Sequence, residues 1–254
     1  MDRASDKPVT LVTGAASGIG LAIAAKMAAA GHGLALFDLA ADRLGEIADG
    51  FAANGVPCLA IAGDASREAD VAALFEATHR RFGRLDAVVC AAGIARTGDV
   101  RAMDLADWQR MMDVNLTSVF LAAKHGMDAL IASGRGCLVA ISSDAGVRGS
   151  RDYGAYCASK HGVIGLVRTL ALDFGREGVR SNVVCPSFVD TPMADALLRE
   201  GERDRAFYEA RTPMGRFAKA EEVADAVHFL CSNEASYVNG LVFNLDGGTT
   251  AGNF

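Results

Sequence analysis

Short, continuously apolar runs alternate along this chain with longer segments in which apolar residues recur at spacings of three and four. Runs of the first kind are typical of strands that helices cover on both faces. They predict seven strands, at Val9–Thr13, Gly33–Asp38, Cys58–Ala62, Leu85–Cys90, Gly136–Ser142, Arg180–Cys185 and Leu241–Leu245. The longer segments predict helices at Ile19–Ala30, Ala41–Asn54, Glu68–Phe82, Leu105–Ser133, Tyr153–Glu177 and Glu221–Ser232. Because strand–helix–strand units repeat, we expect an α/β fold with a doubly wound, seven-stranded parallel sheet and helices on both faces.

No linker or repeat interrupts this pattern, so we expect residues 1–254 to form a single domain. The segment at about 191–216 differs, because it is charged, has two short helical patterns and contains no strand. It follows a strand on the side where open α/β sheets bind ligands, and we interpret it as a substrate lid. A solvated helical hairpin is the alternative. For a lid, we expect Met193, Leu197, Leu198 and Phe207 to face inward, and Glu200, Glu202, Arg203 and Asp204 to form the solvated turn.

Composition narrows the function classes. The chain is 51% hydrophobic and 22% charged, which is typical of a globular protein, and its net charge of −6 disfavours a nucleic-acid partner. No apolar stretch is long enough to span a bilayer, and the N-terminus lacks the order of a signal peptide, so we expect no membrane partner. The six cysteines are widely spaced and form no metal-binding cluster, which favours reduced thiols, no metal and a cytoplasmic location.

The first predicted strand leads directly into a glycine-rich turn and then a helix. Glycines in the sequence Thr13-Gly14-Ala15-Ala16-Ser17-Gly18-Ile19-Gly20 permit a tight turn and a close approach to a pyrophosphate at the helix N-terminus. The spacing GxxxGxG differs from the GxGxxG fingerprint, and an ordinary strand–helix turn is the alternative. The strand on one side, the helix on the other and an acidic residue after the second strand all favour a dinucleotide site.

That acidic residue is Asp38, which ends the second predicted strand. A carboxylate there accepts hydrogen bonds from both ribose hydroxyls of an adenosine and repels a 2′-phosphate. No basic residue stands at Ser17 or Leu39 to attract such a phosphate, so the charges favour NAD over NADP as cofactor. Capping of the next helix is a second role open to Asp38. Asp64 and its neighbour Ala65 follow the third strand, where we expect contact with the adenine, although Asp64 could instead cap the helix near Glu68.

The helix predicted at Tyr153–Glu177 carries the clearest acid–base chemistry. Tyr156 and Lys160 are four residues apart and share one helical face, so the ammonium group is expected to lower the pKa of the phenol. Such a phenol exchanges a proton with an alcohol or a carbonyl oxygen. An exposed Tyr–Lys pair is the alternative. Ser142 and Ser143 end the fifth predicted strand, where a hydroxyl can hydrogen-bond the reacting oxygen or simply support a turn.

Together these motifs resemble the short-chain dehydrogenases/reductases over the chain from Val9 to Gly248. The resemblance is carried by TGAASGIG at 13–20, ISS at 141–143, YCASK at 156–160, the later CPSFVDTP and the terminal LDGG. It implies a Rossmann fold in which Ser143, thirteen residues before Tyr156, is the catalytic serine. It also implies that Asn115 holds a water in a proton relay, that Lys160 binds the nicotinamide ribose, and that Val189 and Thr191 bind the carboxamide.

Two positions depart from the family pattern. The family's NNAG appears as Cys90-Ala91-Ala92-Gly93, so bracing hydrogen bonds from two side-chain amides are lost, while Gly93 still permits close approach to a cofactor. The family's PG after the sixth strand appears as Pro186-Ser187. From the resemblance we take Ile19, Ala92, Gly93 and Pro186 as further cofactor contacts.

We therefore predict an NAD-dependent oxidoreductase that transfers hydride reversibly between a secondary alcohol and its ketone. A 3-oxoacyl thioester reductase of the same family and a catalytically silent NAD-binding sensor are the alternatives. Surplus apolar residues on the helix that contains Tyr156, together with the resemblance, predict a homotetramer. The substrate pocket is expected to include Asp144–Asp152, Ala95, Arg96 and the lid. Its arginines, among them Arg148, Arg151 and Arg211, leave an acidic or phosphorylated substrate open.

Overall fold

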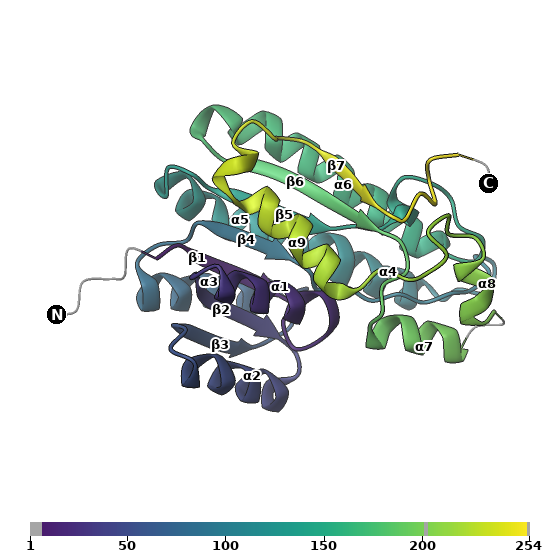
Figure 1. The fold of residues 1–254 in the computed structure, drawn as a ribbon, viewed down its shortest axis with the longest axis horizontal. Helices are drawn as coiled ribbons and strands as arrows, with labels where there is room; N and C mark the ends of the chain where they lie inside the picture. The colour runs from purple at the N-terminus through teal and green to yellow at the C-terminus, as the bar shows by residue number, and fades with distance from the viewer. Residues whose placement is uncertain (1–6, 201–202, 253–254) are drawn as a thin grey trace.

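The fold is built on one seven-stranded parallel sheet with the strand order β3-β2-β1-β4-β5-β6-β7 (Figure 1). The computed structural model describes residues 7–200 and 203–252. Its strands are β1 Val9–Thr13, β2 Gly33–Asp38, β3 Cys58–Ala62, β4 Ala87–Cys90, β5 Cys137–Ile141, β6 Arg180–Pro186 and β7 Val242–Leu245. Every neighbouring pair of strands is parallel. The predicted α/β Rossmann fold is confirmed, and the predicted strands differ from the observed ones only at their ends.

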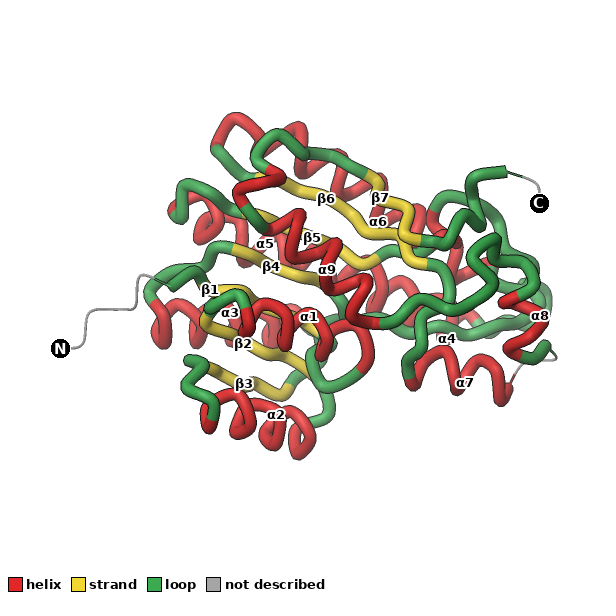
Figure 2. The backbone as a smooth tube through the Cα atoms, in the orientation of Figure 1, coloured by secondary structure: helices red, strands yellow, loops and turns green. Residues whose placement is uncertain are grey.

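Helices cover both faces of this sheet (Figure 2). On one face α1, α2 and α9 enclose a core with β1, β2, β4 and β5, and on the other face α3, α5 and α6 enclose a second core. The helices are α1 Gly18–Ala29, α2 Ala41–Ala53, α3 Glu68–Phe82, α4 Leu105–Met112, α5 Ser118–Ala132, α6 Gly154–Phe174, α7 Pro192–Glu200, α8 Arg205–Glu209 and α9 Ala220–Cys231. Within the described residues, none of these helices has the length and apolar character needed to cross a bilayer.

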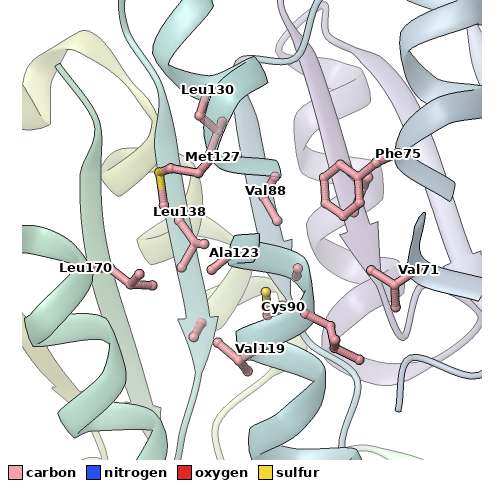
Figure 3. Packing of buried hydrophobic residues seen from close by; sticks show 14 of the residues in the cluster. Val71, Phe75, Val88, Cys90, Val119, Ala123, Met127, Leu130, Leu138 and Leu170 are labelled. Atoms are coloured by element: carbon pink, nitrogen blue, oxygen red, sulfur yellow. The ribbon is translucent and has the colours of Figure 1, made fainter. Parts of the chain in front are cut away.

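The core beneath α3, α5 and α6 is tightly packed. A Cβ atom at Gly126 of α5 would lie 2.7 Å from the ring of Phe75, so glycine at this position lets α5 approach α3 closely. This core holds α6 against the sheet and so positions the side chains at the N-terminal end of α6. Members shown in Figure 3 are Val71, Phe75, Val88, Cys90, Val119, Ala123, Met127, Leu130, Leu138 and Leu170.

The prediction of one continuous helix at Leu105–Ser133 is wrong in one respect, because the structure has two α-helices in this segment. A π-helical turn at Asp113–Thr117 separates α4 from α5. Such turns are rare and occur frequently at functional sites. Hydrophobic periodicity continues through the turn and therefore does not reveal it. The turn includes Asn115, whose side chain is 1% exposed.

The carboxyl ends of the strands meet at one edge of the sheet, where α7 and α8 also lie (Figure 1). These two helices occupy the segment in which the sequence predicted two short helical patterns. The strand order reverses between β1 and β4, and ligands of doubly wound sheets bind in the crevice at such a reversal. The fold thus brings the glycine-rich turn, Ser143 and the segment after β6 to the same edge.

Candidate active site

The glycine-rich turn closes tightly on itself and on the neighbouring strand. Gly14 has a φ of 69°, and a Cβ atom there would lie 2.8 Å from main-chain atoms of Ala92. At Gly20 a Cβ atom would lie 2.0 Å from the carbonyl oxygen of Gly14. Only glycine fits at these two positions, and the turn therefore delivers the chain directly into α1 at Gly18. Free N–H groups at this helix N-terminus suit the pyrophosphate of a dinucleotide.

Asp38 is held in a fixed orientation beside this turn. Its two carboxylate oxygens accept hydrogen bonds from the main-chain N–H groups of Ala16 and Ala40, each at 3.0 Å. The contact with Ala40, just before α2, means that Asp38 also satisfies a main-chain donor at the start of that helix. Sequence reasoning missed Arg43, whose Nε donates to the carbonyl oxygen of Ala16 at 3.0 Å. Arg43 is distant from the glycines along the sequence, but the first turn of α2 brings it to the same place.

Asp64 is engaged with polar neighbours at the end of β3. It accepts hydrogen bonds from the main-chain N–H of Ser66 at 2.9 Å and from its hydroxyl at 2.6 Å, and Arg110 donates to it at 3.1 Å. Burial alone would raise the pKa of Asp64, but the hydrogen bonds from Ser66 and Arg110 lower it. The alternative role as the cap of α3 is wrong, because α3 begins after Arg67 and has no side-chain cap. Ala65 beside it is buried in the core.

The two serines after β5 have different partners. Ser142 donates to the main-chain carbonyl of Lys160 at 2.9 Å and so ties the end of β5 to α6. The Ser143 hydroxyl donates to Asp144 at 3.0 Å and accepts from the N–H of Ala145 at 3.1 Å. Its side chain also lowers the pKa of the Tyr156 phenol. Of the two serines, Ser143 is therefore the one whose side chain acts on the tyrosine.

Tyr156 and Lys160 lie on α6 as the spacing predicted, but their electrostatics differ from the expectation. Burial raises the pKa of Tyr156 to about 12, and the hydrogen bond with Ser143 opposes this only in part. Lys160 is 5% exposed, and burial lowers its pKa to about 8. Its ammonium nitrogen lies 5.6 Å from the centre of the Tyr156 ring and donates to the carbonyl oxygen of Ile141 at 3.0 Å. Burial, and not the Lys160 ammonium, therefore sets the direction of the Tyr156 pKa shift, contrary to the expectation.

Asn115 fastens the π-helical turn to the loop after β4. Its side-chain oxygen accepts from the N–H of Ile94 at 2.8 Å, and its Nδ2 donates to the carbonyl of Ile94 at 2.9 Å and to the hydroxyl of Ser159 at 3.1 Å. Both N–H groups of the amide are thus used inside the protein, and its oxygen accepts one hydrogen bond from the loop. Gly93 lies beside both Asn115 and Lys160, since a Cβ atom at this glycine would be 3.3 Å from the Asn115 side-chain oxygen and 3.5 Å from the Lys160 ammonium.

The departure at Cys90-Ala91-Ala92-Gly93 is compensated by another side chain. The Thr13 hydroxyl accepts hydrogen bonds from the main-chain N–H groups of Ala91 and Ala92, both at 3.2 Å. This hydroxyl, from the first residue of the glycine-rich sequence, braces β4 against β1. The missing side-chain amides therefore do not leave this loop unsupported.

The segment after β6 lies against the glycine-rich turn. A Cβ atom at Gly18 would contact the Thr191 side chain at 3.2 Å, so the start of α7 and the start of α1 are neighbours. The Thr191 hydroxyl donates to the carbonyl of Val189 at 3.2 Å. Val189 in turn forms a parallel bridge with Ala218, which fixes the base of the 191–216 segment.

A cavity of about 380 Å³ at this edge of the sheet brings the predicted catalytic residues Ser143, Tyr156 and Lys160 together, whereas Asn115, Asp38 and Asp64 do not line it. It also includes residues that sequence reasoning did not assign to the site, such as Phe188, whose ring lies 4.1 Å from that of Tyr208. Tyr153 lines the cavity too, with its ring centre 6.0 Å from that of Tyr156, and burial raises its pKa. The predicted site residues that line the cavity are Ile19, Gly93, Ser143, Tyr156, Lys160, Pro186, Val189 and Thr191.

The lid residues follow the expectation with two exceptions. Met193, Leu197 and Phe207 line the cavity as predicted, whereas Leu198 does not. Arg203 was expected in the solvated turn and instead lines the cavity, because its guanidinium stacks on the Phe207 ring. Asp204 is exposed and caps α8 by accepting from the N–H of Phe207. The predicted position of Glu202 lies outside the described residues, and so does the side chain of Glu200.

Two further expectations concern pocket chemistry. Arg96 was expected in the pocket but forms an ion pair with Asp107 at 2.6 Å and does not line the cavity. Across residues 7–200 and 203–252, no group of three or more His, Cys, Asp or Glu side chains is placed to hold a metal ion.

Comparisons with known proteins agree with this geometry. Residues 14–250 match a family model described as enoyl-(acyl carrier protein) reductase. The cis-4-hydroxycyclohexanecarboxylate dehydrogenase of Sinomonas cyclohexanicum is 38% identical over 252 residues, which are 99% of this chain and 100% of that protein. A crystal structure of a variant of actinorhodin polyketide ketoreductase with NADPH has a TM-score of 0.92 and 32% identity, and the match covers 97% of this chain and 99% of that one.

A crystal structure of a Burkholderia thailandensis oxidoreductase, described as belonging to the short chain dehydrogenase/reductase family, has a TM-score of 0.89 and 33% identity. That match covers 98% of this chain and 95% of the other. The likeness therefore extends over nearly the whole sequence. This chain belongs to the short-chain dehydrogenase/reductase family, whose members are oxidoreductases that use a nicotinamide cofactor.

Proposed function

We propose that this protein is an NAD-dependent dehydrogenase that interconverts a secondary alcohol and the corresponding ketone. The observation that carries the proposal is that Ser143, Tyr156 and Lys160 line one cavity, with the Lys160 ammonium 5.6 Å from the centre of the Tyr156 ring. Two hydroxyls and a buried cation in one cavity are the groups needed to hold an alcohol oxygen and to remove or return its proton.

The chain is suited to hold a nicotinamide dinucleotide. The glycines that admit no Cβ atom and the fixed carboxylate of Asp38 form a cradle for a pyrophosphate and an adenosine ribose. When bound, the cofactor supplies the acceptor or donor of hydride. We assign the pyrophosphate to Gly14, Ser17, Gly18, Ile19 and Gly20, the adenosine to Asp38, Asp64 and Ala65, and the nicotinamide half to Ala92, Gly93, Tyr156, Lys160, Pro186, Val189 and Thr191.

The residues of this chain divide the acid–base work. Ser143 holds the substrate oxygen, and Tyr156 removes the hydroxyl proton during oxidation or returns it during reduction. With a pKa of about 8, Lys160 is cationic at neutral pH and close enough to stabilise a phenolate at Tyr156. Asn115 positions the loop at Ile94, and we assign a relay water to this residue.

Tyr156→Phe tests this assignment. Loss of the phenol should reduce turnover to less than about a hundredth. NAD binding, measured by calorimetry, should stay close to that of the wild type because phenylalanine keeps the ring that we assign to the nicotinamide half and loses only the hydroxyl. Tyr153→Phe is the matched comparison, because Tyr153 lines the same cavity without a lysine four residues later. A larger loss of turnover for Tyr153→Phe would transfer the acid–base role to that residue.

A 3-oxoacyl thioester reductase that uses NADPH is the second candidate. Arg43 supports it, because this cation lies beside the Asp38 cradle, where a 2′-phosphate would be placed. The description of the matching family model and the NADPH in the polyketide ketoreductase structure point the same way. Asp38 opposes it by charge. The two candidates are separated by turnover assays with NAD and with NADP on cyclic secondary alcohols, polyols and 3-hydroxyacyl thioesters. Absence of turnover with all of these substrates would favour a silent NAD-binding sensor.

The assembly and the lid are part of the proposal. We infer a homotetramer, since Leu172 of α6 is 83% exposed and Phe120 of α5 is also exposed, and such apolar side chains favour a partner. Light scattering at micromolar concentration tests the assembly, and a monomeric mass would refute it. The six free thiols favour a cytoplasmic location.

We also infer that residues 191–216 act as a lid over the cavity, because α7 and α8 contribute residues to its wall.

A further inference from the structure

The cavity concentrates positive charge in a protein whose net charge is −6. Its basic lining residues are Lys160, Arg148, Arg151, Arg203 and Arg211, and among the described residues that line it Asp144 is the single carboxylate. Guanidinium groups that gather at one cavity of an acidic protein repel one another unless an anion lies between them.

Arg148 and Arg151 have acidic partners. Arg148 forms an ion pair with Asp144 at 2.5 Å, and Arg151, whose side chain is 81% exposed, approaches Asp152 at 3.6 Å. Asp144 therefore balances the charge of Arg148, and Arg151 lies largely in solvent beside Asp152, so we assign neither of them to a ligand.

Arg203 and Arg211 differ from them. Both stack on the ring of Phe207, with the guanidinium carbons 4.7 and 3.7 Å from its centre. Within residues 7–200 and 203–252, neither forms an ion pair with a carboxylate. The nearby acids are occupied, since Asp204 caps α8 and Asp190 and Glu209 both pair with Arg205.

We propose that Arg203 and Arg211 form the recognition site for an oxyanion on the substrate, which is then a secondary alcohol that carries a carboxylate or a similar group away from its carbinol carbon. A guanidinium stacked on an aromatic ring can still direct its N–H edge to a carboxylate in a bidentate manner. Arg211 donates one hydrogen bond to the carbonyl oxygen of Phe207 at 3.3 Å, which uses one of the five N–H groups of a guanidinium.

The position of the two guanidinium groups favours this role. The stacking on Phe207 orients both of them before a ligand arrives, which lowers the entropy cost of binding. Arg203 and Arg211 line the same cavity as Ser143 and Tyr156, so an anion bound by the arginines lies in the cavity that holds the reacting oxygen.

This inference rests on the proposed function and narrows its substrate class. The anion could come from two sources, because the phosphates of a dinucleotide offer the same chemistry as a substrate carboxylate. The experiments below separate the two by measuring the alcohol and the cofactor independently.

The first experiment compares two ligands on the wild-type protein. Cyclohexanecarboxylate and cyclohexanecarboxamide have the same shape and differ in charge, and their binding to the NAD-saturated protein is measured by calorimetry at low and high salt. We expect the carboxylate to bind at least about tenfold more tightly and to lose this advantage as salt is added. Equal affinities would overturn the proposal without any variant. Turnover of neutral alcohols tests the proposed function separately.

The second experiment uses Arg203→Gln and Arg211→Gln, with Arg80→Gln as the matched control. Arg80 is exposed on α3, pairs only loosely with Glu76 at 3.5 Å and does not line the cavity. With 4-hydroxycyclohexanecarboxylate as substrate, each cavity variant should raise KM about tenfold and leave kcat nearly unchanged, because the anion is bound equally before and during the reaction. The KM for the neutral 4-hydroxycyclohexanecarboxamide should not change.

The cofactor arm completes the test. The KM for NAD should be the same in the wild type, both cavity variants and the Arg80→Gln control, and circular dichroism confirms that each variant is folded. If instead the variants raise the KM for NAD and leave that for the carboxylate alcohol unchanged, the arginines hold the dinucleotide and the proposal is wrong. Arg203→Lys provides a second check, since retention of the charge should restore part of the affinity for the carboxylate.

Discussion

Replacement of Asp38 by alanine should shift the cofactor preference from NAD toward NADP, and the contacts of Asp38 lead us to expect a large effect. The carboxylate is fixed by two main-chain N–H groups, so its orientation toward an adenosine ribose costs little entropy on binding. Asp38→Ala removes its hydrogen bonds to the ribose and also exposes the N–H groups of Ala16 and Ala40, which are donors that suit a phosphate. The cation of Arg43 remains beside them.

The magnitude follows from these contacts. Loss of hydrogen bonds from the ribose to a charged acceptor should weaken NAD use by about 2 kcal/mol, and loss of the repulsion should improve NADP use by a similar amount. The ratio of kcat/KM for NAD to that for NADP should therefore fall by roughly a thousandfold. Initial rates with both cofactors on one alcohol measure it directly.

Two further variants make this test specific. Asp42→Ala removes the same charge from the exposed first turn of α2, where no cradle exists, and should alter the ratio by no more than about threefold. In the Asp38→Ala background, Arg43→Ala should cancel most of the gain with NADP. A wild-type preference for NADP, or an unchanged ratio in Asp38→Ala, would refute the reasoning. Asp38→Asn keeps the side-chain shape and serves if the alanine variant is unstable.

Three other predictions rest on burial, close packing and the position of α7. Since burial lowers the pKa of Lys160 from 10.5 to about 8, the folded protein binds fewer protons than the unfolded chain between these values. The free energy of unfolding should therefore rise with pH across that window. The Lys160→Met variant should lose this rise. Urea unfolding at pH 7 should show the variant to be more stable than the wild type by about 1–3 kcal/mol, because it buries no charge. Gly14→Ala should abolish NAD binding in calorimetry, because the new Cβ atom would collide with the main chain at Ala92. At Gly45 of α2 a Cβ atom would meet nothing within 4 Å, so Gly45→Ala should stabilise the helix by up to about 1 kcal/mol. Amides of α7 should exchange fast in the free protein and slowly with NAD and a substrate analogue, and equal protection in both states would mean a rigid hairpin.

Much of the fold was predictable because the apolar pattern is a direct record of burial. Continuously apolar strands require helices on both faces, and the glycine-rich turn marks where the chain must pass from β1 to α1. Strand ends were less accurate, since the strand predicted at Gly136–Ser142 is longer than the observed β5 at both ends. The π-helical turn at Asp113–Thr117 was invisible, because one extra residue in a turn leaves the local composition unchanged.

The site was predictable in its parts but not in its charge balance. Asp38 and Tyr156 follow strands or begin helices, so their positions derive from local pattern. Arg203 was assigned to solvent because it lies in a charged stretch, yet an aromatic neighbour four residues later draws its guanidinium to the cavity wall. Contacts of this kind depend on the path of the chain between α7 and α8, which the sequence pattern does not specify.

The Tyr156–Lys160 pair illustrates why a motif fixes the identity of a site more readily than its energetics. A spacing of four brings the ammonium to the ring of the tyrosine, where it lies 5.6 Å from the centre, but the spacing says nothing of the solvent that both groups lose. Burial disfavours the phenolate and the ammonium alike, which raises one pKa to about 12 and lowers the other to about 8. Each ionised form that the reaction needs is thus costly in this structure, and further positive charge beside Tyr156 would lower the cost of the phenolate while raising that of the ammonium. The pH dependence of alcohol oxidation should accordingly report the pair as a unit, with kcat/KM rising with pH above neutrality, and a flat profile would mean that Tyr156 does not lose its proton in the reaction.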